Sequence, residues 1–365
     1  MIAIVGGGIT GAYLAFMLAK NGSEVTVYDA YALSYTGSSC NPGGINPFHG
    51  PGMPGVMADF YFKSYREHLS NREEVAELSG IDFDLRVVNR LFLAFSNADV
   101  DKLRRMEPDY LAKNYFDAHW MSSKQVIERD SRISDEVLGG LYTTGNLTVN
   151  TSLYQQALIA AAGKLGVKFV AKDVSRLLIS DNRVTHVIAD EQAVPVSALA
   201  ITNGVWATSL LRSLGSSLQV NAVKGELLLV DLKDLKFSFD VTHELTGLYQ
   251  YRNSLYWIGG TKSDPSMHPG ITLAGKDSLL QNLSRMIPGM AVDHVVGHFA
   301  GYRPVTEDRL PAIGKLARYA NVFVGTGGGS KGILLSAGIG QTLTHLINGN
   351  DVAEIDFLSP DRFDK

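Results

Sequence analysis

Met1-Ile2-Ala3-Ile4-Val5-Gly6-Gly7-Gly8-Ile9-Thr10-Gly11 opens the chain, and in it a short apolar run leads directly into the pattern G-x-G-x-x-G. A helical pattern over 12–20 follows and ends at Asn21-Gly22. A second apolar run over 25–28 then stops at Asp29. Strand, glycine turn, helix and strand in this order form the βαβ fingerprint of a dinucleotide-binding fold. The segment therefore predicts an α/β fold of the Rossmann type.

The glycines and the acid of this segment each have a role in holding a dinucleotide. Gly6 allows the tight turn, Gly8 lets a pyrophosphate approach the backbone, and Gly11 lets the helix pack closely on the strand. Unpaired amides and the helix dipole at the helix N-terminus favour the negative pyrophosphate. Asp29 follows Gly8 by about 20 positions, the spacing at which an acidic side chain binds the ribose hydroxyls.

The composition is that of an enzyme-sized chain without a charge bias. Its 365 residues are enough for two domains, and a net charge of −4 gives no indication of nucleic acid or an anionic membrane as a partner. No apolar run reaches the length of a membrane span, and a strand that starts at residue 2 leaves no room for a signal peptide. The single cysteine, Cys40, excludes an internal disulfide and a cysteine-rich metal site. We therefore expect a cytoplasmic protein, and its oligomeric state stays open.

Elements of the nucleotide-binding type recur in the middle and near the end of the chain, with strand-rich stretches between them. The loop over 36–47 is predicted to be irregular, and 99–131 is predicted to be helix-like. The other predicted helices cover 58–78, 151–165, 273–287 and 333–347; predicted strands cover 86–95, 167–170, 174–178, 184–189, 199–204, 223–230, 247–252, 254–260, 295–302 and 322–324. We predict one discontinuous dinucleotide-binding domain over 1–80, 145–215 and 298–356, and an inserted β-rich domain over 81–144 and 216–297.

Three features favour FAD over NAD as the cofactor. The glycine-rich loop over 325–332 leads into a helix whose N-terminal amides would stabilise negative charge on the N1–C2=O side of a reduced flavin. The loop over 37–47 offers hydroxyls and bare amides to an isoalloxazine edge. The chain has one complete βαβ fingerprint, so it provides no separate NAD domain.

Several stretches resemble the glycine oxidase / D-amino-acid oxidase family of FAD-dependent amine oxidoreductases, which includes sarcosine oxidase-like enzymes. They are 6–11, 37–44, 201–206, 224–226, 301–314, 327–335 and 357–363. The run R-P-x-T-x-D-x-x-P-x-I-G within 303–314 and the last two stretches are specific to the family.

This resemblance implies a Rossmann-type (GR2-like) FAD-binding domain with an interleaved β-rich α+β substrate domain. FAD is expected to bind noncovalently in extended form, with the substrate on one flavin face under the β-rich domain. The implied reaction oxidises the C–N bond of a small amino acid by hydride transfer to flavin, and the imine then hydrolyses. Glycine, sarcosine, a D-amino acid and a proline-like compound are the expected substrates; oxygen, a quinone or a protein is the expected electron acceptor.

The resemblance also assigns residues. Arg303 is expected to bind the substrate carboxylate, because a guanidinium at a predicted strand end before Pro304 offers a planar bidentate fork. The stretch Leu248-Tyr249-Gln250-Tyr251 aligns with a substrate-wall tyrosine, and it leaves open whether Tyr249 or Tyr251 faces the pocket. The residues expected to contact FAD are Gly6, Gly8, Ile9, Thr10, Gly11, Asp29, Ala30, Ser38, Ser39, Asn41, Gly43, Gly44, Val174, Thr202, Asn203, Gly204, Trp206, Arg303, Gly328, Gly329, Ser330, Lys331, Gly332 and Ile333.

Some positions depart from the family pattern. Asn203 stands where a small residue is usual, and Ser330 stands where glycine oxidase-like members tend to have an arginine, with Lys331 following instead. The stretch 48–55 has no assignment. The substrate therefore stays open, while the type of reaction is better defined.

Two other functions compete with amino acid oxidation. One is a tRNA-modifying FAD amine oxidoreductase, which a basic surface or a fused methyltransferase domain would indicate; the chain is acidic overall. The other is a non-catalytic FAD subunit of a hetero-oligomeric dye-linked dehydrogenase. Cys40 is interpreted as a packed thiol rather than a flavin thioether. His294 and His298 lie four apart in a strand-like segment rather than in a helix, and no metal site is predicted.

Overall fold

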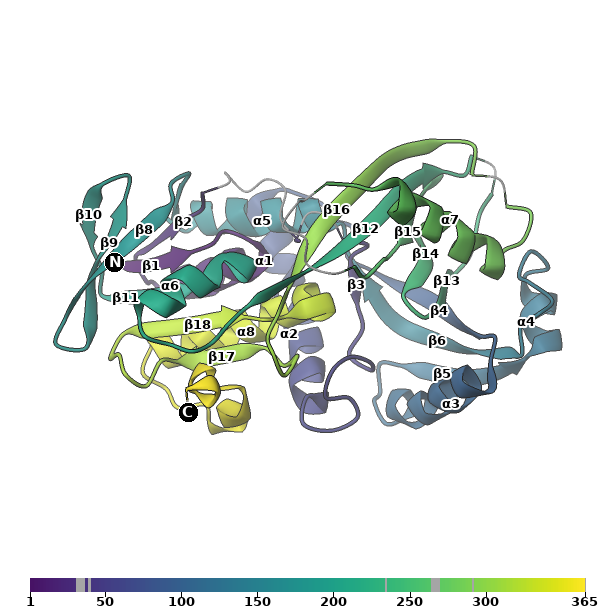
Figure 1. Ribbon diagram of the computed structural model, residues 1–365, viewed down its shortest axis with the longest axis horizontal. Coiled ribbons are helices and arrows are strands. Elements are labelled where there is room, and N and C mark those ends of the chain that lie inside the picture. The colour runs from purple at the N-terminus through teal and green to yellow at the C-terminus, as the bar shows by residue number, and fades with distance from the viewer. Residues whose placement is uncertain (31–36, 39–40, 234, 264–269, 291, 365) are drawn as a thin grey trace.

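The computed structural model describes residues 1–30, 37–38, 41–233, 235–263, 270–290 and 292–364. Two large sheets lie side by side along the length of the molecule, one toward each end (Figure 1). One has six strands and includes the N-terminal strand, and the other is a mixed sheet of nine strands. A small antiparallel sheet lies beside the first and consists of β8 (Val174–Ser180), β9 (Arg183–Ala189) and β10 (Gln192–Pro195).

The six-stranded sheet is built on the N-terminal βαβ unit. The helix α1 (Ile9–Lys20) connects β1 (Ile2–Val5) to β2 (Val25–Tyr28), and these two strands are parallel, as the fingerprint predicts. The remaining strands are β7 (Lys168–Val170) beside β2, then β11 (Ala198–Ile201), β18 (Val322–Thr326) and the antiparallel edge strand β17 (Ala312–Lys315) on the side of β1.

Both faces of this sheet are buried, as is usual for parallel strands. Ile4, Val27 and Phe323 belong to a core shared with α1, α2 (Ala58–Ser79), α5 (Thr151–Lys164) and α8 (Gly332–Ile347). Val5 and Leu199 face the opposite way, into a core shared with α6 (Ala207–Ser213). Because successive side chains of a strand point to opposite faces, short apolar strands supply both cores.

A buried histidine ties three of these helices together. The imidazole of His68 on α2 lies 2.9 Å from the Tyr154 hydroxyl of α5 through Nδ1, and Nε2 lies 2.9 Å from the carbonyl oxygens of Ile333 and Leu334 in the first turn of α8. Burial lowers the pKa of His68 to about 4, so the ring is neutral at pH 7. The N-terminus of α8 is therefore held by side-chain contacts as well as by packing.

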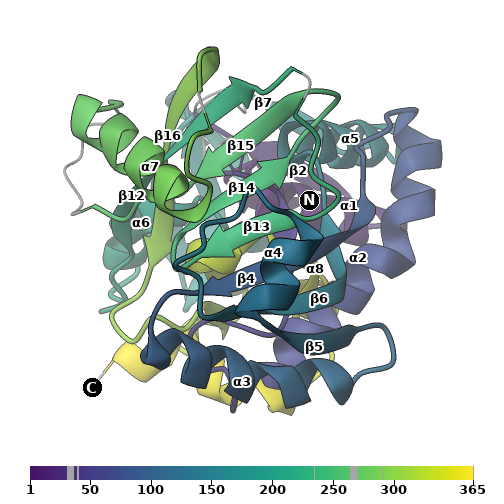
Figure 2. The ribbon, with the colours of Figure 1, turned by 90° about the vertical axis from the view of Figure 1, so that its right-hand side faces the viewer.

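The nine-stranded sheet carries the β-rich segments. Its order is β16 (Val295–Val305), β12 (Asn221–Asp231), β15 (Leu255–Gly259), β14 (Thr246–Gln250), β13 (Asp240–His243), β4 (Arg86–Ala94), β6 (Gly139–Thr148) and β3 (Gly44–Ile45), and β5 (Asp117–Ser122) also pairs with β6. Leu228, Leu248 and Ile258 on one face belong to the core that α4 (Ser123–Arg129) and α7 (Leu273–Met286) cover (Figure 2).

The opposite face of this sheet carries a row of charged and polar side chains. Cross-strand partners share a face, and the register places Arg303, Tyr249, Asp240 and Arg90 together on the side away from α7. The remaining elements are α3 (Asn97–Leu111) and the 3₁₀ turns Gly204–Trp206, Gly329–Lys331, Ala353–Leu358 and Pro360–Phe363. Among the described residues, no helix combines the length and the apolar character that crossing a bilayer requires.

Some sequence predictions were wrong in detail. The region 99–131 contains β5 between α3 and α4, and capping boxes at Ser96 and Ser122 start the two helices. The unpredicted strand β6 is buried on both faces, so it lacks the alternation that marks an exposed sheet. The loop over 36–47 includes the two-residue strand β3.

The strand predicted over 295–302 continues to Val305. It therefore passes through Arg303 and Pro304, which pair with Val223 and Ala222. Proline is tolerated here because β16 is the edge strand of the sheet. Arg303 thus stands inside a paired strand, near its end, and its backbone is fixed by the ladder. The predicted domain boundaries stay a prediction.

Candidate FAD and substrate site

A cavity of about 570 Å³ lies at the carboxyl ends of the parallel strands. It is lined at the end of β1 by Val5 and Gly6, at the end of β2 by Asp29, and at the end of β11 by Thr202. Open parallel sheets bind their ligands at this edge. The cavity extends to β12 and β16 of the second sheet, so residues of both sheets line it.

The glycines of the N-terminal turn have the roles that the fingerprint predicts. Gly6 has φ +102°, and a Cβ there would lie 2.5 Å from the Asn203 Cα. A Cβ at Gly11 would lie 1.9 Å from the Gly6 carbonyl oxygen, so helix and turn meet with no room for a side chain. Gly8 differs, because a Cβ there would have only Ser38 Oγ, at 3.4 Å, within 4 Å among the described atoms. Its backbone faces the cavity.

Side chains fix this turn from both sides. The Asp29 carboxylate accepts a hydrogen bond of 2.7 Å from the Gly7 amide, and Gln155 on α5 donates one of 2.8 Å to the Gly7 carbonyl. The amide of Ile9 donates to Ser38 Oγ at 3.1 Å. An amide of the first turn of α1 therefore meets a polar oxygen, as it would in contact with a pyrophosphate.

The glycine loop before α8 forms another wall of the cavity. Gly328, Gly329, Gly332 and Ile333 line it. The N-cap residue of α8, Lys331, makes no side-chain bond to the first turn of this 16-residue helix. The uncapped amides and the helix dipole favour negative charge at this end, as expected for the anionic edge of a reduced flavin.

Most of the predicted FAD contacts line this cavity. They are Gly6, Gly8, Ile9, Thr10, Asp29, Ala30, Ser38, Asn41, Val174, Thr202, Asn203, Gly204, Trp206, Arg303, Gly328, Gly329, Gly332 and Ile333. Gly11 packs behind the turn instead, and Gly43, Gly44, Ser330 and Lys331 are not among the lining residues. Ser39 and Cys40 lie outside the described residues. The individual contacts with FAD stay predictions.

Arg303 lines the cavity, and its guanidinium packs against the backbone of two glycines. A Cβ at Gly225 would lie 2.4 to 2.6 Å from three guanidinium atoms, and a Cβ at Gly260 would lie 3.1 Å from Nη2. Nη1 donates to the Thr261 carbonyl at 2.9 Å. Among the described residues, no carboxylate lies within 4.0 Å of this guanidinium. Burial lowers the pKa of Arg303, yet the group stays charged at pH 7.

Tyr249 lies on the same face as Arg303. Its ring covers Gly247, where a Cβ would lie 2.4 Å from Cζ. The Arg90 guanidinium lies 5.2 Å from the ring centroid, and Arg90 Nη2 forms a buried ion pair of 2.9 Å with Asp240. Burial raises the pKa of Tyr249. Tyr249 therefore has a fixed place between two guanidinium groups.

Tyr251 has a different setting. Its hydroxyl accepts a hydrogen bond of 2.7 Å from Asn150, the N-cap residue of α5, and its ring packs edge-on against Trp257. Neither Tyr249 nor Tyr251 is among the residues that line the cavity. Of the two, Tyr249 is the one that shares its surroundings with Arg303, and which of them faces the substrate stays a prediction.

Lys331 points away from the cavity toward the stretch that follows β3. Its Nζ donates to the Asn46 carbonyl at 3.1 Å and lies 3.0 Å from His49 Nε2. Burial, and then the charge of Arg90, lower the pKa of Lys331 to about 7. His49, in the stretch 48–55 that the sequence left without an assignment, is therefore a contact of Lys331.

Several residues at the site were missed from the sequence. Gln155 holds the glycine turn, Thr261 holds Arg303, and Gly225 makes room for the guanidinium. Lys172 and Asp173 line the nucleotide end of the cavity. Gly225 had a signal, since it stands in one of the family-like stretches, 224–226. The others are brought in by contacts between distant segments.

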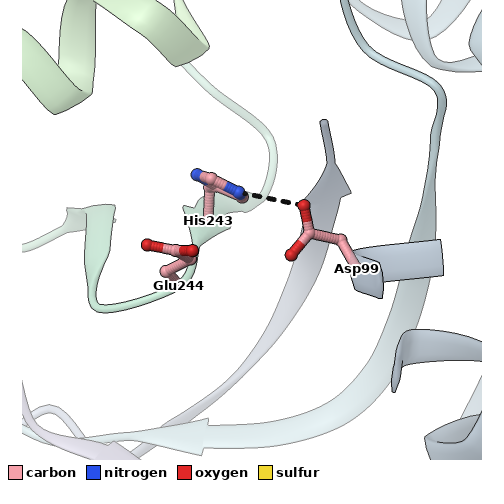
Figure 3. Close-up of side chains that lie close together, drawn as sticks. All are labelled: Asp99, His243 and Glu244. Atoms are coloured by element: carbon pink, nitrogen blue, oxygen red, sulfur yellow. Dashed lines mark hydrogen bonds and ion pairs between the residues drawn. The ribbon is translucent and has the colours of Figure 1, made fainter. Parts of the chain in front are cut away.

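A possible metal-binding group lies elsewhere. The side-chain ligand atoms of Asp99, His243 and Glu244 lie within 4.8 Å of one another (Figure 3). The Asp99 carboxylate, however, already accepts hydrogen bonds from the Phe95 and Ser96 amides and caps α3. None of the three lines the cavity. We assign this group a structural role.

The residues present fit FAD. A βα turn with a bare Gly8 faces the cavity at one end, Asp29 is held against this turn by the Gly7 amide, and an uncapped helix meets the other end. A family model described as "DAO: FAD dependent oxidoreductase" matches residues 1–346. The chain therefore belongs to the DAO family of FAD-dependent oxidoreductases, which confirms the predicted family, fold class and cofactor.

Relatives within this family include a glycine oxidase and a D-amino acid dehydrogenase. Glycine oxidase of Bacillus subtilis (strain 168) is 24% identical over 99% of this chain and 96% of its own length. D-amino acid dehydrogenase of Rhizobium rhizogenes (strain K84 / ATCC BAA-868) is 25% identical, with 97% of each chain covered. The crystal structure of glycine oxidase from Geobacillus kaustophilus superimposes with a TM-score of 0.93 at 24% identity, over 99% of this chain and 98% of that one.

Proposed function

We propose that this oxidoreductase oxidises the C–N bond of a small amino acid bound by Arg303. The observation that supports this most directly is a guanidinium without a described counter-ion at the end of the FAD cavity. A buried cation on a glycine floor is an unfavourable arrangement unless a carboxylate joins it. Relatives named glycine oxidase and D-amino acid dehydrogenase are consistent with such a substrate.

In this proposal the residues orient the substrate and adjust its charge. Arg303 binds the carboxylate and thereby fixes the position of the α-carbon. Burial beside Arg303 disfavours the charged form of the substrate amine, so the amine loses its proton more readily. Bound FAD supplies the acceptor for the hydride that leaves the α-carbon. The resulting imine hydrolyses in water, so the proposal assigns no acid or base residue.

The test is anaerobic flavin bleaching with glycine, sarcosine, D-amino acids, proline and hydroxyproline. We expect at least one of them to bleach the flavin. Readmitting air and then adding a quinone would separate an oxidase from a dehydrogenase. A yellow protein that no member of the panel bleaches would contradict the proposal and favour a non-catalytic FAD subunit.

A further inference from the structure

A cluster of nitrogen donors lies on the far side of Tyr249 from Arg303. Its members, which we call the β3–β4 cluster, are Arg90 on β4, His49 after β3, and Lys331 at the start of α8. The Lys331 Nζ lies 3.0 Å from His49 Nε2, and the His49 ring packs edge-on against Phe92 at 5.9 Å. Phe92 and Arg90 are two residues apart on β4, so they share a face. Arg90 also acts electrostatically on both partners.

Two buried donors of this cluster have no acceptor among the described residues. His49 is neutral at pH 7 because its pKa lies well below the usual value through burial and the charge of Lys331. Lys331 donates to Nε2, so the histidine proton is assigned to Nδ1, which is buried and has no partner. Arg90 Nε is also buried without a hydrogen-bond partner, and the residue as a whole is only 5% exposed. Leaving such donors unpaired is costly.

The charges of the cluster do not balance. Asp240 neutralises Arg90 at 2.9 Å, but no carboxylate of the described residues lies within 4.0 Å of the Lys331 ammonium. Its two acceptors, the Asn46 carbonyl and His49 Nε2, are neutral groups. When Lys331 is protonated, the cluster therefore carries one excess positive charge together with two unpaired N–H donors.

Gly44 leaves space for a methyl group beside Arg90. A Cβ built at Gly44 would have only the two Arg90 Nη atoms within 4 Å among the described atoms, at 3.7 and 3.8 Å. Gly44 belongs to the loop expected along the isoalloxazine. Tyr249 touches Arg90 on one side and senses the charge of Arg303 on the other. A small molecule held by Arg303 would therefore extend past Tyr249 toward this space.

We propose that the β3–β4 cluster is a subsite for a second carboxylate, so that the substrate is an amino acid with two acidic groups. The second group would sit either on the nitrogen substituent, as in an N-carboxymethyl amino acid, or on the side chain. This proposal rests on the proposed function of the same site. A carboxylate accepts several hydrogen bonds at once and would neutralise the excess charge, which neither water nor a neutral group would do.

Binding can be tested without turnover. Glutarate and pentanoate have the same number of carbons, and each is titrated into the oxidised holoenzyme while the flavin absorbance is followed. Glutarate should bind at least tenfold more tightly than pentanoate. Lys331→Met should weaken glutarate by ten- to a hundredfold and change pentanoate less than twofold. Arg303→Ala should weaken both ligands.

A second variant guards against misfolding. Gly44→Ala fills the space beside Arg90 without a clash and should weaken glutarate selectively. Equal affinities for the two ligands in the wild type would overturn the subsite, as would a preference that survives both variants. Anaerobic reduction by iminodiacetate, D-aspartate and D-glutamate then distinguishes the two sources of the second carboxylate. If glutarate is preferred but nothing bleaches the flavin, the proposed function fails while the subsite stands.

Discussion

Gly225→Ala should disable substrate recognition without removing FAD. The new Cβ would lie 2.4 to 2.6 Å from three atoms of the Arg303 guanidinium, whereas nonbonded heavy atoms rest at about 3.5 Å. The guanidinium must therefore move by about 1 Å, which breaks its 2.9 Å bond to the Thr261 carbonyl. Misplacement by about 1 Å lowers the rate of a positioned reaction by about a hundredfold.

The fold should tolerate this change. Gly225 is not among the residues with positive φ, and the atoms in its way belong to the far end of a flexible side chain. Alanine also restricts the unfolded chain, so the melting temperature should stay the same or rise slightly. Gly163→Ala, on α5 where a Cβ meets no described atom within 4 Å, is the matched control.

The assay compares anaerobic flavin reduction by an amino acid with that by the corresponding amine lacking the carboxylate. In Gly225→Ala the rate with the amino acid should fall by about a hundredfold, while the rate with the amine should hardly change. FAD content, from absorbance, should equal that of the control. An equal loss on both compounds, or no loss on either, would refute the view that Gly225 makes room for a carboxylate-binding guanidinium.

Other changes test the rest of the site. Arg303→Ala should lower kcat/KM for the amino acid by roughly thirty- to several-thousandfold, with Arg303→Lys recovering only part of it; wild-type kinetics in either variant would exclude the carboxylate contact. Asp29→Ala should weaken FAD retention, measured by equilibrium dialysis, with unchanged substrate preference, and unaltered FAD affinity would remove Asp29 from the ribose site. Acid precipitation should release FAD into the supernatant, and flavin that stays with the pellet would point to a thioether at Cys40. Because the folded-state pKa of His68 is about 4 and the ordinary value is 6.5, the unfolded state binds the extra proton between these values. Stability should therefore fall by about 3 kcal/mol as the pH drops from 6.5 to 4, and His68→Gln should lack this component in urea unfolding; a parallel fall in the variant would assign it to other groups.

The nucleotide end of the site could be predicted because its determinants are local. Gly6, Gly8 and Gly11 stand within one turn, and the next strand carries Asp29 to the same edge. The strand β6 could not be predicted, because burial of both its faces removes the periodicity that marks a strand.

The substrate end depends on contacts that no local pattern encodes. The position of Arg303 was inferred from its motif, but the motif did not reveal that the strand continues through it. Its floor at Gly225 and its anchor at Thr261 come from neighbouring strands of a nine-stranded sheet. Arg90, His49 and Lys331 meet from three separate segments, and a buried lysine or histidine has no sequence signature.

The walls of the FAD cavity come from segments that are remote along the chain. Residues 5–10 form one end, while 325–339 close the other. During synthesis the first half of the site is therefore made early. The chain cannot bind the whole dinucleotide until residue 339 has been added. Once bound, the dinucleotide holds the two segments together as a noncovalent cross-link around a very long loop. Stability should accordingly rise with free FAD concentration, and depletion of FAD should lower the fraction of folded protein.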